Sequence, residues 1–202
     1  AAITAAPEMQ ADYLKKHDEF LAQTGGKVLL VCNMVWSNEE FEYFGLEQFP
    51  NLPALIKYHD LLQSIGWFAY FDAKSYLGWT FNNQGEPVKP EFPPPPAPGE
   101  TPIYKLVFFE MKQAYYEEQE KVEELVKGQH AMAKQIKREI VFDAYTRMNN
   151  EENFSFMIER YPNLEAMVAH YKNLEFTGWF KYSKARSYLG RAVSGALSGL
   201  DS

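Results

Sequence analysis

The sequence predicts an α+β fold built from two tandem β-α-β-β-α-β units, and an internal repeat is the main reason. Residues 66–70 (GWFAY) match residues 178–182 (GWFKY) at an offset of 112 residues. The same offset aligns residues 27–79 with residues 139–191 without a gap. Such self-similarity indicates two copies of one structural unit. Within each copy, strand-like and helix-like periods alternate in the order stated.

The second copy contains every element of this order. Its expected strands are β-branched or aromatic runs, and its expected helices carry apolar residues on one face. The predicted elements are a strand at Ile103–Met111, a helix at Gln113–Lys137, strands at Glu139–Met148 and Phe154–Arg160 joined by a turn at Asn149 and Asn150, a helix from Leu164 to Leu174, and, after Gly178, a strand at Trp179–Ala185.

The first copy gives the same order without its first strand. The counterpart of Ile103–Met111 would lie upstream of residue 1. Another segment fills that position, or the sheet has a vacancy, or the natural chain is longer. The predicted elements are a helix at Pro7–Gln23, strands at Lys27–Trp36 and Phe41–Gln48, a helix at Leu52–Ser64 and a strand at Trp67–Ala73.

A proline-rich stretch separates the copies. Residues 93–96 are consecutive prolines, which favour an extended polyproline conformation and are typical of a linker. We therefore expect repeat 1 at residues 1–82, the linker at 83–102, repeat 2 at 103–191 and a C-terminal tail at 192–202.

Strand positions that are apolar in both copies are expected to pack under the helices. The opposite face of such a sheet carries no helix, and in the first copy this face is too apolar for water. We therefore expect the two sheets to pack face to face and to close a barrel-like chamber. The expected core pairs are Val28/Ile140, Leu30/Phe142, Cys32/Ala144, Met34/Thr146, Trp36/Met148, Phe44/Phe156, Leu46/Ile158, Phe68/Phe180 and Tyr70/Tyr182.

This arrangement resembles a known group of folds. The β-α-β-β-α-β order is that of the ferredoxin-like unit. Its duplication, with a Gly-Trp-Phe-x-Tyr segment after the second helix, resembles the dimeric α+β barrel superfamily. Residues 41–78 look most like the uncharacterised darcynin-like group, followed by the stress-responsive barrel and antibiotic-biosynthesis monooxygenase-like groups. The resemblance implies a pseudo-dimeric α+β barrel, and its members include cofactor-independent oxygenases, isomerases, haem enzymes and non-enzymatic proteins.

An alternating polar set on the helix-free face of the second copy is the best candidate for a catalytic site. A symmetric hairpin would place Asp143 across from Glu159, and Arg147 across from Ser155. Two facing carboxylates in a partly dry chamber can hold or move a proton. Tyr145 and Arg147 could then bind an anionic oxygen. The competing interpretation is a solvated or salt-bridged sheet face.

Large aromatic side chains and a lysine on the same face are expected to contact a substrate. For the tryptophans, packing between the sheets is the alternative. Glu47 occupies the position equivalent to Glu159, and we interpret this recurrence as a packing or turn requirement rather than as catalysis. The expected substrate-binding residues are Trp67, Trp179, Tyr43 and Lys181.

Composition limits the partners. The net charge of −7 disfavours a nucleic acid partner, and no apolar run is long enough for a membrane span. Cys32 is expected to be a small buried hydrophobe. The histidines lack the spacing of a helical metal site, and packing is favoured over haem ligation by His59 or His170. We expect no metal and no cofactor.

Two function classes stay open. The first is a small-molecule-binding barrel protein that acts as a cofactor-independent oxygenase or isomerase on an aromatic or polyketide-like compound. The second is a non-catalytic binding or structural subunit of a larger assembly, with a protein partner or a second copy of the chain. Whether the protein is an enzyme is left open. A cytoplasmic location is slightly favoured, with export after cleavage as the alternative, because the chain begins at Ala1 without a recognisable signal region.

Overall fold

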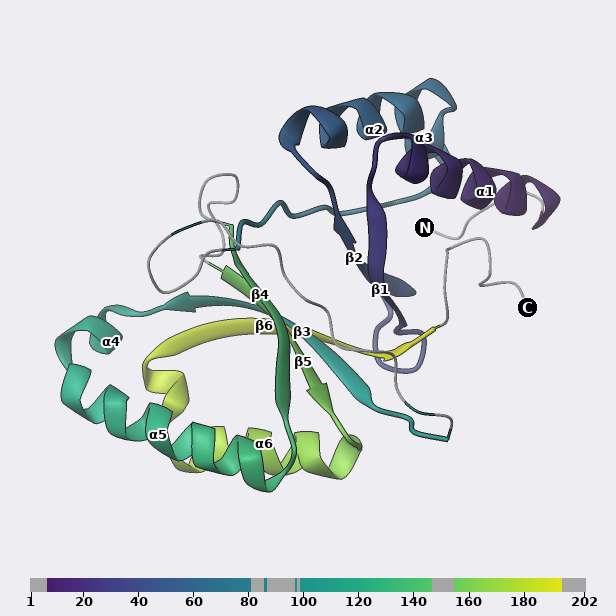
Figure 1. The fold of residues 1–202 in the computed structure, drawn as a ribbon. Coiled ribbons are helices and arrows are strands. Elements are labelled where there is room, and N and C mark those ends of the chain that lie inside the picture. The colour runs from purple at the N-terminus through teal and green to yellow at the C-terminus, as the bar shows by residue number, and fades with distance from the viewer. Residues whose placement is uncertain (1–6, 81–85, 87–96, 98, 147–154, 194–202) are drawn as a thin grey trace. The chain divides into compact units, whose positions relative to one another are not determined.

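The computed structural model describes residues 7–80, 86, 97, 99–146 and 155–193. It divides into two compact units (Figure 1), and each is described by itself. Unit 1 consists of Ala1–Asn33, Tyr43–Ser75 and Ala192–Ser202, and unit 2 consists of Met34–Glu42 and Tyr76–Arg191. Most of the predicted linker and tail lie outside the described residues, so those boundaries stay predictions.

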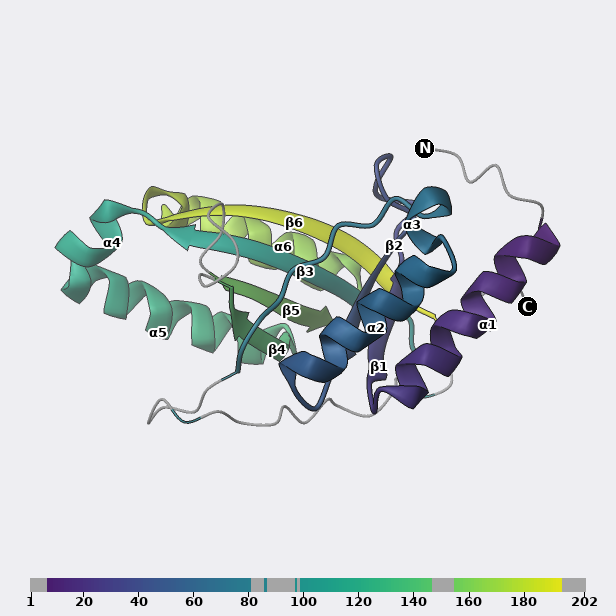
Figure 2. The ribbon, with the colours of Figure 1, turned by 90° about the horizontal axis from the view of Figure 1, so that it is seen from above.

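Unit 1 is a β-hairpin with two helices lying on one side of it (Figures 1 and 2). The hairpin is antiparallel and pairs Leu30 with Leu46 and Cys32 with Phe44. The elements are α1 (Pro7–Gln23), β1 (Lys27–Asn33), β2 (Tyr43–Gln48), α2 (Leu52–Ser64) and α3 (Trp67–Tyr70).

Unit 2 has the complete β-α-β-β-α-β order. Its strands follow the order β6-β3-β5-β4, in which every described neighbour pair is antiparallel. The long helices α5 and α6 lie on one face of this sheet (Figure 1). The elements are β3 (Ile103–Met111), α4 (Gln113–Glu117), α5 (Gln119–Gln135), β4 (Glu139–Tyr145), β5 (Ser155–Tyr161), α6 (Leu164–Phe176), the 3-10 helix η1 (Trp179–Lys181) and β6 (Ser183–Ala192).

The two copies share local details that sequence alone does not display. The Asn51 side chain accepts a hydrogen bond from the backbone N–H three residues on and so begins α2, and Asn163 begins α6 in the same way, both at 2.9 Å. Each β-hairpin also has a β-bulge, centred on Leu29 in one copy and on Val141 in the other. These paired features are independent support for the duplication.

The predicted strands after the second helices are wrong in part. In the first copy, Trp67–Tyr70 is the short helix α3 instead of a strand. In the second, η1 occupies the first residues of the predicted strand, and β6 begins only at Ser183. Gly66 (φ 74°) and Gly178 (φ 71°) have the left-handed backbone conformation that glycine adopts readily. After each glycine the chain forms a short helical turn. The sequence pattern predicts an extended strand there.

The predicted faces of the sheet are reversed. Glu159 and Tyr161 of β5 face α6, where Tyr161 contacts His170. Because side chains alternate along a strand, Phe156 and Ile158 face the side without helices. There Phe156 packs against Phe108, with ring centroids 5.8 Å apart.

Four predicted core residues are exposed, while others are buried on the side without helices. A short segment covers that side in unit 2: a Cβ on Gly78 would lie 2.5 Å from the Phe156 ring, so only glycine fits there. Both faces are therefore buried, and alternation could not decide which one carries the helices. Met148 lies outside the described residues. The predicted core residues that are exposed are Trp36, Phe68, Tyr70 and Ile140.

The α+β fold class, with helices and an antiparallel sheet, is confirmed. The missing first strand of the first unit stays a prediction. Cys32 is fully buried, and burial raises the pKa of its thiol, as expected for a small packed hydrophobe. Among the described residues, no helix combines the length and the apolar character that crossing a membrane requires.

Candidate functional site

A set of polar side chains is buried between the sheet and α6 in unit 2. Glu159 and Tyr161 come from β5, His170 from α6, and Arg138 from the turn before β4. Together these four form what we call the buried polar ring. Lys105 of β3 joins them because β3 pairs it directly with Glu159. Burial of so many polar groups requires that they satisfy one another.

The hydrogen bonds of the ring have one consistent direction. Arg138 Nη1 can only donate, so His170 Nε2 accepts from it at 2.9 Å and the imidazole hydrogen lies on Nδ1. His170 Nδ1 then donates to the Tyr161 hydroxyl at 2.6 Å. That hydroxyl in turn donates to Glu159 Oε2 at 2.8 Å, and Glu159 Oε1 lies 3.1 Å from Arg138 Nη1. The ring is thus closed with a neutral histidine.

Burial is the largest influence on the pKa values of His170 and Tyr161. Burial and, second, the Arg138 charge lower the pKa of His170 to about 4, which agrees with the neutral imidazole. Burial also raises the pKa of Tyr161, and the neighbouring Glu159 carboxylate raises it too. Tyr161 therefore stays protonated and remains a donor.

Positive charge exceeds negative charge at this site. Lys105 Nζ lies 3.4 Å from Glu159 Oε2, so one carboxylate serves two cations, Lys105 and Arg138. The side chains of both cations are 10% exposed, whereas that of Glu159 is 4% exposed. Arg138 Nε is buried and has no hydrogen-bond acceptor among the residues that the structure describes. A bound water or a ligand could accept a hydrogen bond from this donor.

The equivalent position in unit 1 lacks both cations. Glu47 accepts from His17 Nε2 at 3.0 Å and from the Tyr58 hydroxyl at 3.4 Å. Gly26 stands where the second copy has Arg138, and a Cβ there would lie 2.7 Å from a methyl group of Leu21. The counterpart of Lys105 would belong to the missing strand. The excess positive charge is therefore specific to the second copy.

The predicted catalytic residues do not form the expected pair of carboxylates. Asp143 pairs with Met157 rather than with Glu159, and Tyr145 pairs with Ser155. The hairpin register thus differs by two residues from the symmetric turn that we assumed. Asp143 and Tyr145 are exposed, and Arg147 lies outside the described residues. A catalytic role for these residues stays a prediction.

The predicted substrate-binding residues belong to different units. In unit 1, Trp67 is buried in a core cluster with Leu21 and Tyr58, and Tyr43 is exposed on β2. In unit 2, Trp179 is half-buried in η1, and Lys181 is exposed and forms an ion pair with Glu118. Neither unit alone gathers these residues, so their role as a binding set stays a prediction.

Sequence reasoning missed four of the five residues at this site. The recurrence of Glu47 and Glu159 was the available signal, because a carboxylate kept at one position in both copies needs a partner if it is buried. The partners themselves are 54 residues upstream (Lys105), 21 upstream (Arg138) and 11 downstream (His170) of Glu159. Only the strand register and the turn before β4 bring them together.

The comparisons with known proteins support the fold. The chain is similar to a haem-binding protein from Thermus thermophilus, with 14% identity over 95% of this chain and 85% of that chain and a TM-score of 0.64. It is also similar to chlorite dismutase from Candidatus Nitrospira defluvii in complex with imidazole, with 10% identity over 93% and 83% of the two chains and a TM-score of 0.68. A double variant of that dismutase gives 10% identity, 96% and 86% coverage and a TM-score of 0.70.

These similarities show a shared fold and nothing more specific. No family model matches the sequence, and no curated protein matches it. The resemblance to the darcynin-like, stress-responsive and monooxygenase-like groups therefore stays a prediction.

The histidines do not fit a haem ligated through a buried imidazole. Such a ligand needs a ring nitrogen free to bind iron, but both nitrogens of His170 have partners in the buried polar ring. Both nitrogens of His17 also have partners, Asp18 and Glu47. His59 and His130 are not buried, and the His59 ring stacks on a phenylalanine. Nor do the described residues contain a cluster of histidine, cysteine or carboxylate side chains suited to a metal ion.

Proposed function

We propose that the protein binds a small organic anion beside the buried polar ring of unit 2, with Arg138 and Lys105 as the residues that recognise the negative group. The finer class that we propose is an aromatic carboxylate or an enolate-forming aromatic compound. The observation that carries this proposal is the buried Arg138 Nε–H, which has no acceptor among the described residues and lies beside an excess of positive charge. An anion would accept from this donor and also balance the charge.

The surroundings favour a ligand with an apolar body. On the helix-covered face, Val107 and Ile103 flank Lys105 along β3, and both are buried. Met157 flanks Glu159 in the same way and is half-buried. Placing an aromatic ring beside these side chains would remove its apolar surface from water, which is favourable, while its carboxylate would meet the two cations. This combination of an apolar wall with a few charged groups is typical of small-molecule sites.

Binding is better supported than proton abstraction by Glu159. A general base needs an oxygen directed at the ligand proton. Both Glu159 oxygens already accept from donors of the ring or from Lys105. We therefore propose a binding role for this site. If the protein is an enzyme, the reaction would use the cations to stabilise negative charge on the ligand.

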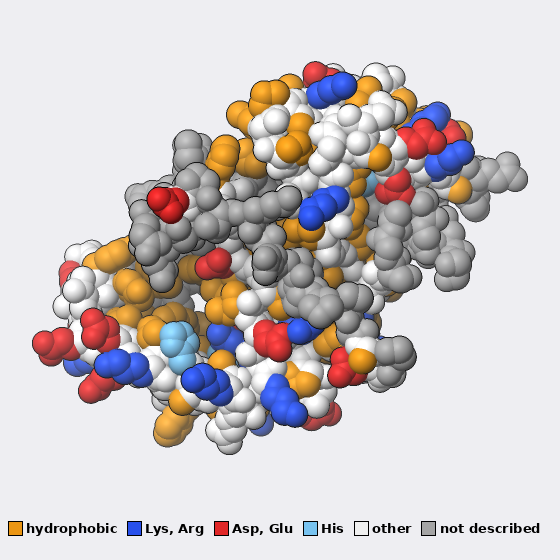
Figure 3. All heavy atoms as spheres, in the orientation of Figure 1, with side chains coloured by type: hydrophobic (Ala, Val, Ile, Leu, Met, Phe, Trp, Pro, Cys, Tyr) orange, Lys and Arg blue, Asp and Glu red, His pale blue; other side chains and the backbone are white. Residues whose placement is uncertain are grey.

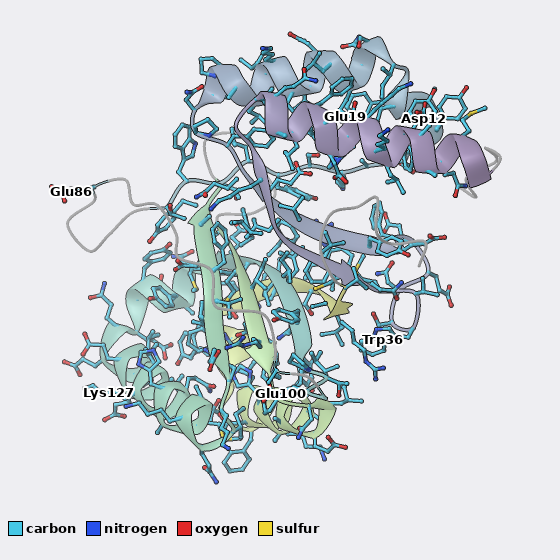
Figure 4. All side chains as sticks on the ribbon, turned by 45° about the vertical axis from the view of Figure 1, so that its right-hand side comes forward. Asp12, Glu19, Trp36, Glu86, Glu100 and Lys127 are labelled. Carbon is cyan, nitrogen blue, oxygen red and sulfur yellow. The ribbon has the colours of Figure 1, made fainter. Side chains whose placement is uncertain are left out.

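Calorimetric titration with sodium benzoate, and with neutral benzamide as its uncharged counterpart, tests the proposal. We expect benzoate to bind and benzamide not to bind. Lys105→Met should weaken benzoate binding by about tenfold or more, because one of two charge-assisted contacts is lost. Lys127→Met is the matched control, since Lys127 lies on the exposed face of α5 and projects away from the sheet (Figure 4).

Arg138→Lys tests whether benzoate binding depends on the Arg138 Nε–H donor or only on the positive charge. The lysine keeps the positive charge but has no Nε–H at that position, so we expect weaker benzoate binding in a protein that still folds. Equal affinity for benzoate and benzamide would overturn the proposal. So would equal effects of Lys105→Met and Lys127→Met, or the absence of binding across a panel of aromatic and aliphatic carboxylates.

A further inference from the structure

One face of α6 carries an exposed apolar stripe at the i, i+4 and i+7 positions Leu164, Val168 and Tyr171. Phe176 at the C-terminal end is 91% exposed but lies on another face of the helix. Exposed hydrophobic residues are normal when they are scattered singly, but a contiguous run on one helix face marks an interaction surface. This stripe does not belong to the site of the proposed function, because His170 and Leu174 face the opposite way and are buried.

The first copy carries a similar stripe at the equivalent positions. Leu52 and Ile56 of α2 are exposed, and Figure 3 shows hydrophobic side chains at the surface over this helix. At the next stripe position His59 stacks on Phe68, with ring centroids 6.0 Å apart. In α6 the matching pair, Tyr171 and Phe180, lies 5.5 Å apart. Each chain therefore has two related apolar faces, and their charges decide which of them can pair.

The two charged residues beside the α6 stripe would attract their counterparts on a second α6 helix that packs antiparallel to the first. Glu165 and Lys172 are two helical turns apart, so they lie on the same flank of the stripe. Both are exposed, and neither forms an ion pair with another described residue. When two α6 helices pack antiparallel, Glu165 of each helix comes opposite Lys172 of the other. A two-fold axis makes this favourable contact twice.

The residues beside the α2 stripe do not carry the same pair of opposite charges. Pro53 and Asp60 stand at the positions equivalent to Glu165 and Lys172. An antiparallel α2–α6 pair between two chains would therefore place Asp60 opposite the partner's Glu165, and like charges repel. An α2–α2 pair would place Asp60 opposite the partner's Pro53 and gain no ion pair. Charge thus selects the α6–α6 pairing.

We propose that α6 forms the interface of a two-fold symmetric dimer with a second copy of this chain. The apolar core of the interface consists of Leu164, Val168 and Tyr171 from each chain. The two Glu165–Lys172 pairs lie at its edge and fix the antiparallel direction. In helix packing of this kind, side chains of one helix fill the grooves of the other.

Sedimentation velocity over a concentration series tests the interface. We expect the wild-type chain to dimerise and Val168→Glu to be a monomer, because the substitution places charge in the apolar core. Ile56→Glu is the matched control on α2 and should dimerise like the wild type. Circular dichroism of both variants checks that they fold.

A charge exchange tests the direction of the pairing. Glu165→Lys should weaken dimerisation by about tenfold or more. Each introduced lysine would face the partner's Lys172, and the like charges repel. Adding Lys172→Glu should restore the wild-type dissociation constant. A monomeric wild type at the highest concentration would overturn the proposal. Equal losses from Val168→Glu and Ile56→Glu, or a double exchange that fails to restore association, would also contradict it.

Discussion

Glu159 and Glu47 occupy equivalent positions in the two copies but have very different surroundings. The Glu159 side chain is 4% exposed and is the counter-ion of Lys105 and Arg138. The Glu47 side chain is 30% exposed, and its described partners are His17 and Tyr58. Breaking a buried ion pair from one side leaves an uncompensated charge, which costs far more than losing an exposed contact.

Replacing each glutamate by glutamine should therefore have unequal effects on stability. We expect Glu159→Gln to lower the free energy of unfolding by about 3–5 kcal/mol, because it leaves two buried cations without an anion. Glu47→Gln should cost about 1 kcal/mol, the usual value for a partly exposed hydrogen bond. Urea unfolding of both variants measures the difference. Similar losses of unfolding free energy in the two variants would contradict the claim that Glu159 balances two buried cations.

His170 makes stability depend on pH in a defined window. Its pKa is lowered to about 4 in the folded protein, chiefly by burial, from an ordinary value of 6.5. Between these two values the unfolded chain binds a proton at this residue and the folded chain does not. Stability from this group is therefore complete above pH 6.5 and declines as the pH falls to about 4.

Urea unfolding between pH 7 and pH 4 should display this decline. We expect His170 to account for a loss of about 3 kcal/mol across the window. The effect should be absent from His170→Gln, whose side chain cannot take up a proton in this range. Arg138, Lys105, Glu159 and Tyr161 surround this position in both proteins, so the difference between the two curves isolates the histidine. Parallel curves for wild type and variant would refute this assignment.

Two glycines on neighbouring elements should respond to alanine in opposite directions. Gly178 has a φ of 71° between α6 and η1, where an alanine is strained although nothing lies within 4 Å of its Cβ. Gly128 lies inside α5, and nothing lies within 4 Å of an added Cβ there either. Space is therefore equal at the two sites, and only the backbone conformation differs.

Thermal unfolding of the two alanine variants measures this contrast. We expect Gly178→Ala to destabilise by about 1 kcal/mol and Gly128→Ala to stabilise by a similar amount, since alanine is the better helix former. Gly178→Asn should cost less than Gly178→Ala because asparagine tolerates left-handed backbone angles. Loss of stability in Gly128→Ala would mean that the backbone of α5 departs from a regular helix.

The sequence was most informative about elements with a clear period and a marked beginning. The helices at Pro7–Gln23 and Leu52–Ser64 and the strand at Ile103–Met111 agree with the structure to the residue. The segments after Gly66 and Gly178 were misjudged because three aromatic residues in a row suit either a strand or a helical turn. The break at Glu118 between α4 and α5 was also missed. There Lys181, Lys121 and Tyr182 lower the pKa of the Glu118 carboxyl to about 2, and two of these partners, Lys181 and Tyr182, come from a distant segment of the chain.

At the scale of the whole molecule, the repeat correctly predicted the α+β fold class and the element order of the second copy, but not the orientation of its sheet. Both faces of the unit 2 sheet are buried, one by helices and the other in part by the segment around Gly78. Alternation separates two faces without saying which of them the helices cover. The reversed faces place Glu159 under α6, where Arg138 and His170 meet it. For this reason the carboxylate was found in the sequence, but the buried polar ring was not.

The central claim is that Arg138 presents an unsatisfied donor to an organic anion. A ¹⁵N–¹H spectrum of the arginine side chains tests it most directly, with the Arg138 Nε–H signal assigned by its loss in Arg138→Lys. We predict that benzoate shifts this signal and slows its exchange with water, while the signal of exposed Arg191 stays in place and benzamide has no effect. An Arg138 signal that does not move with benzoate, or that moves equally with benzamide, would contradict the claim.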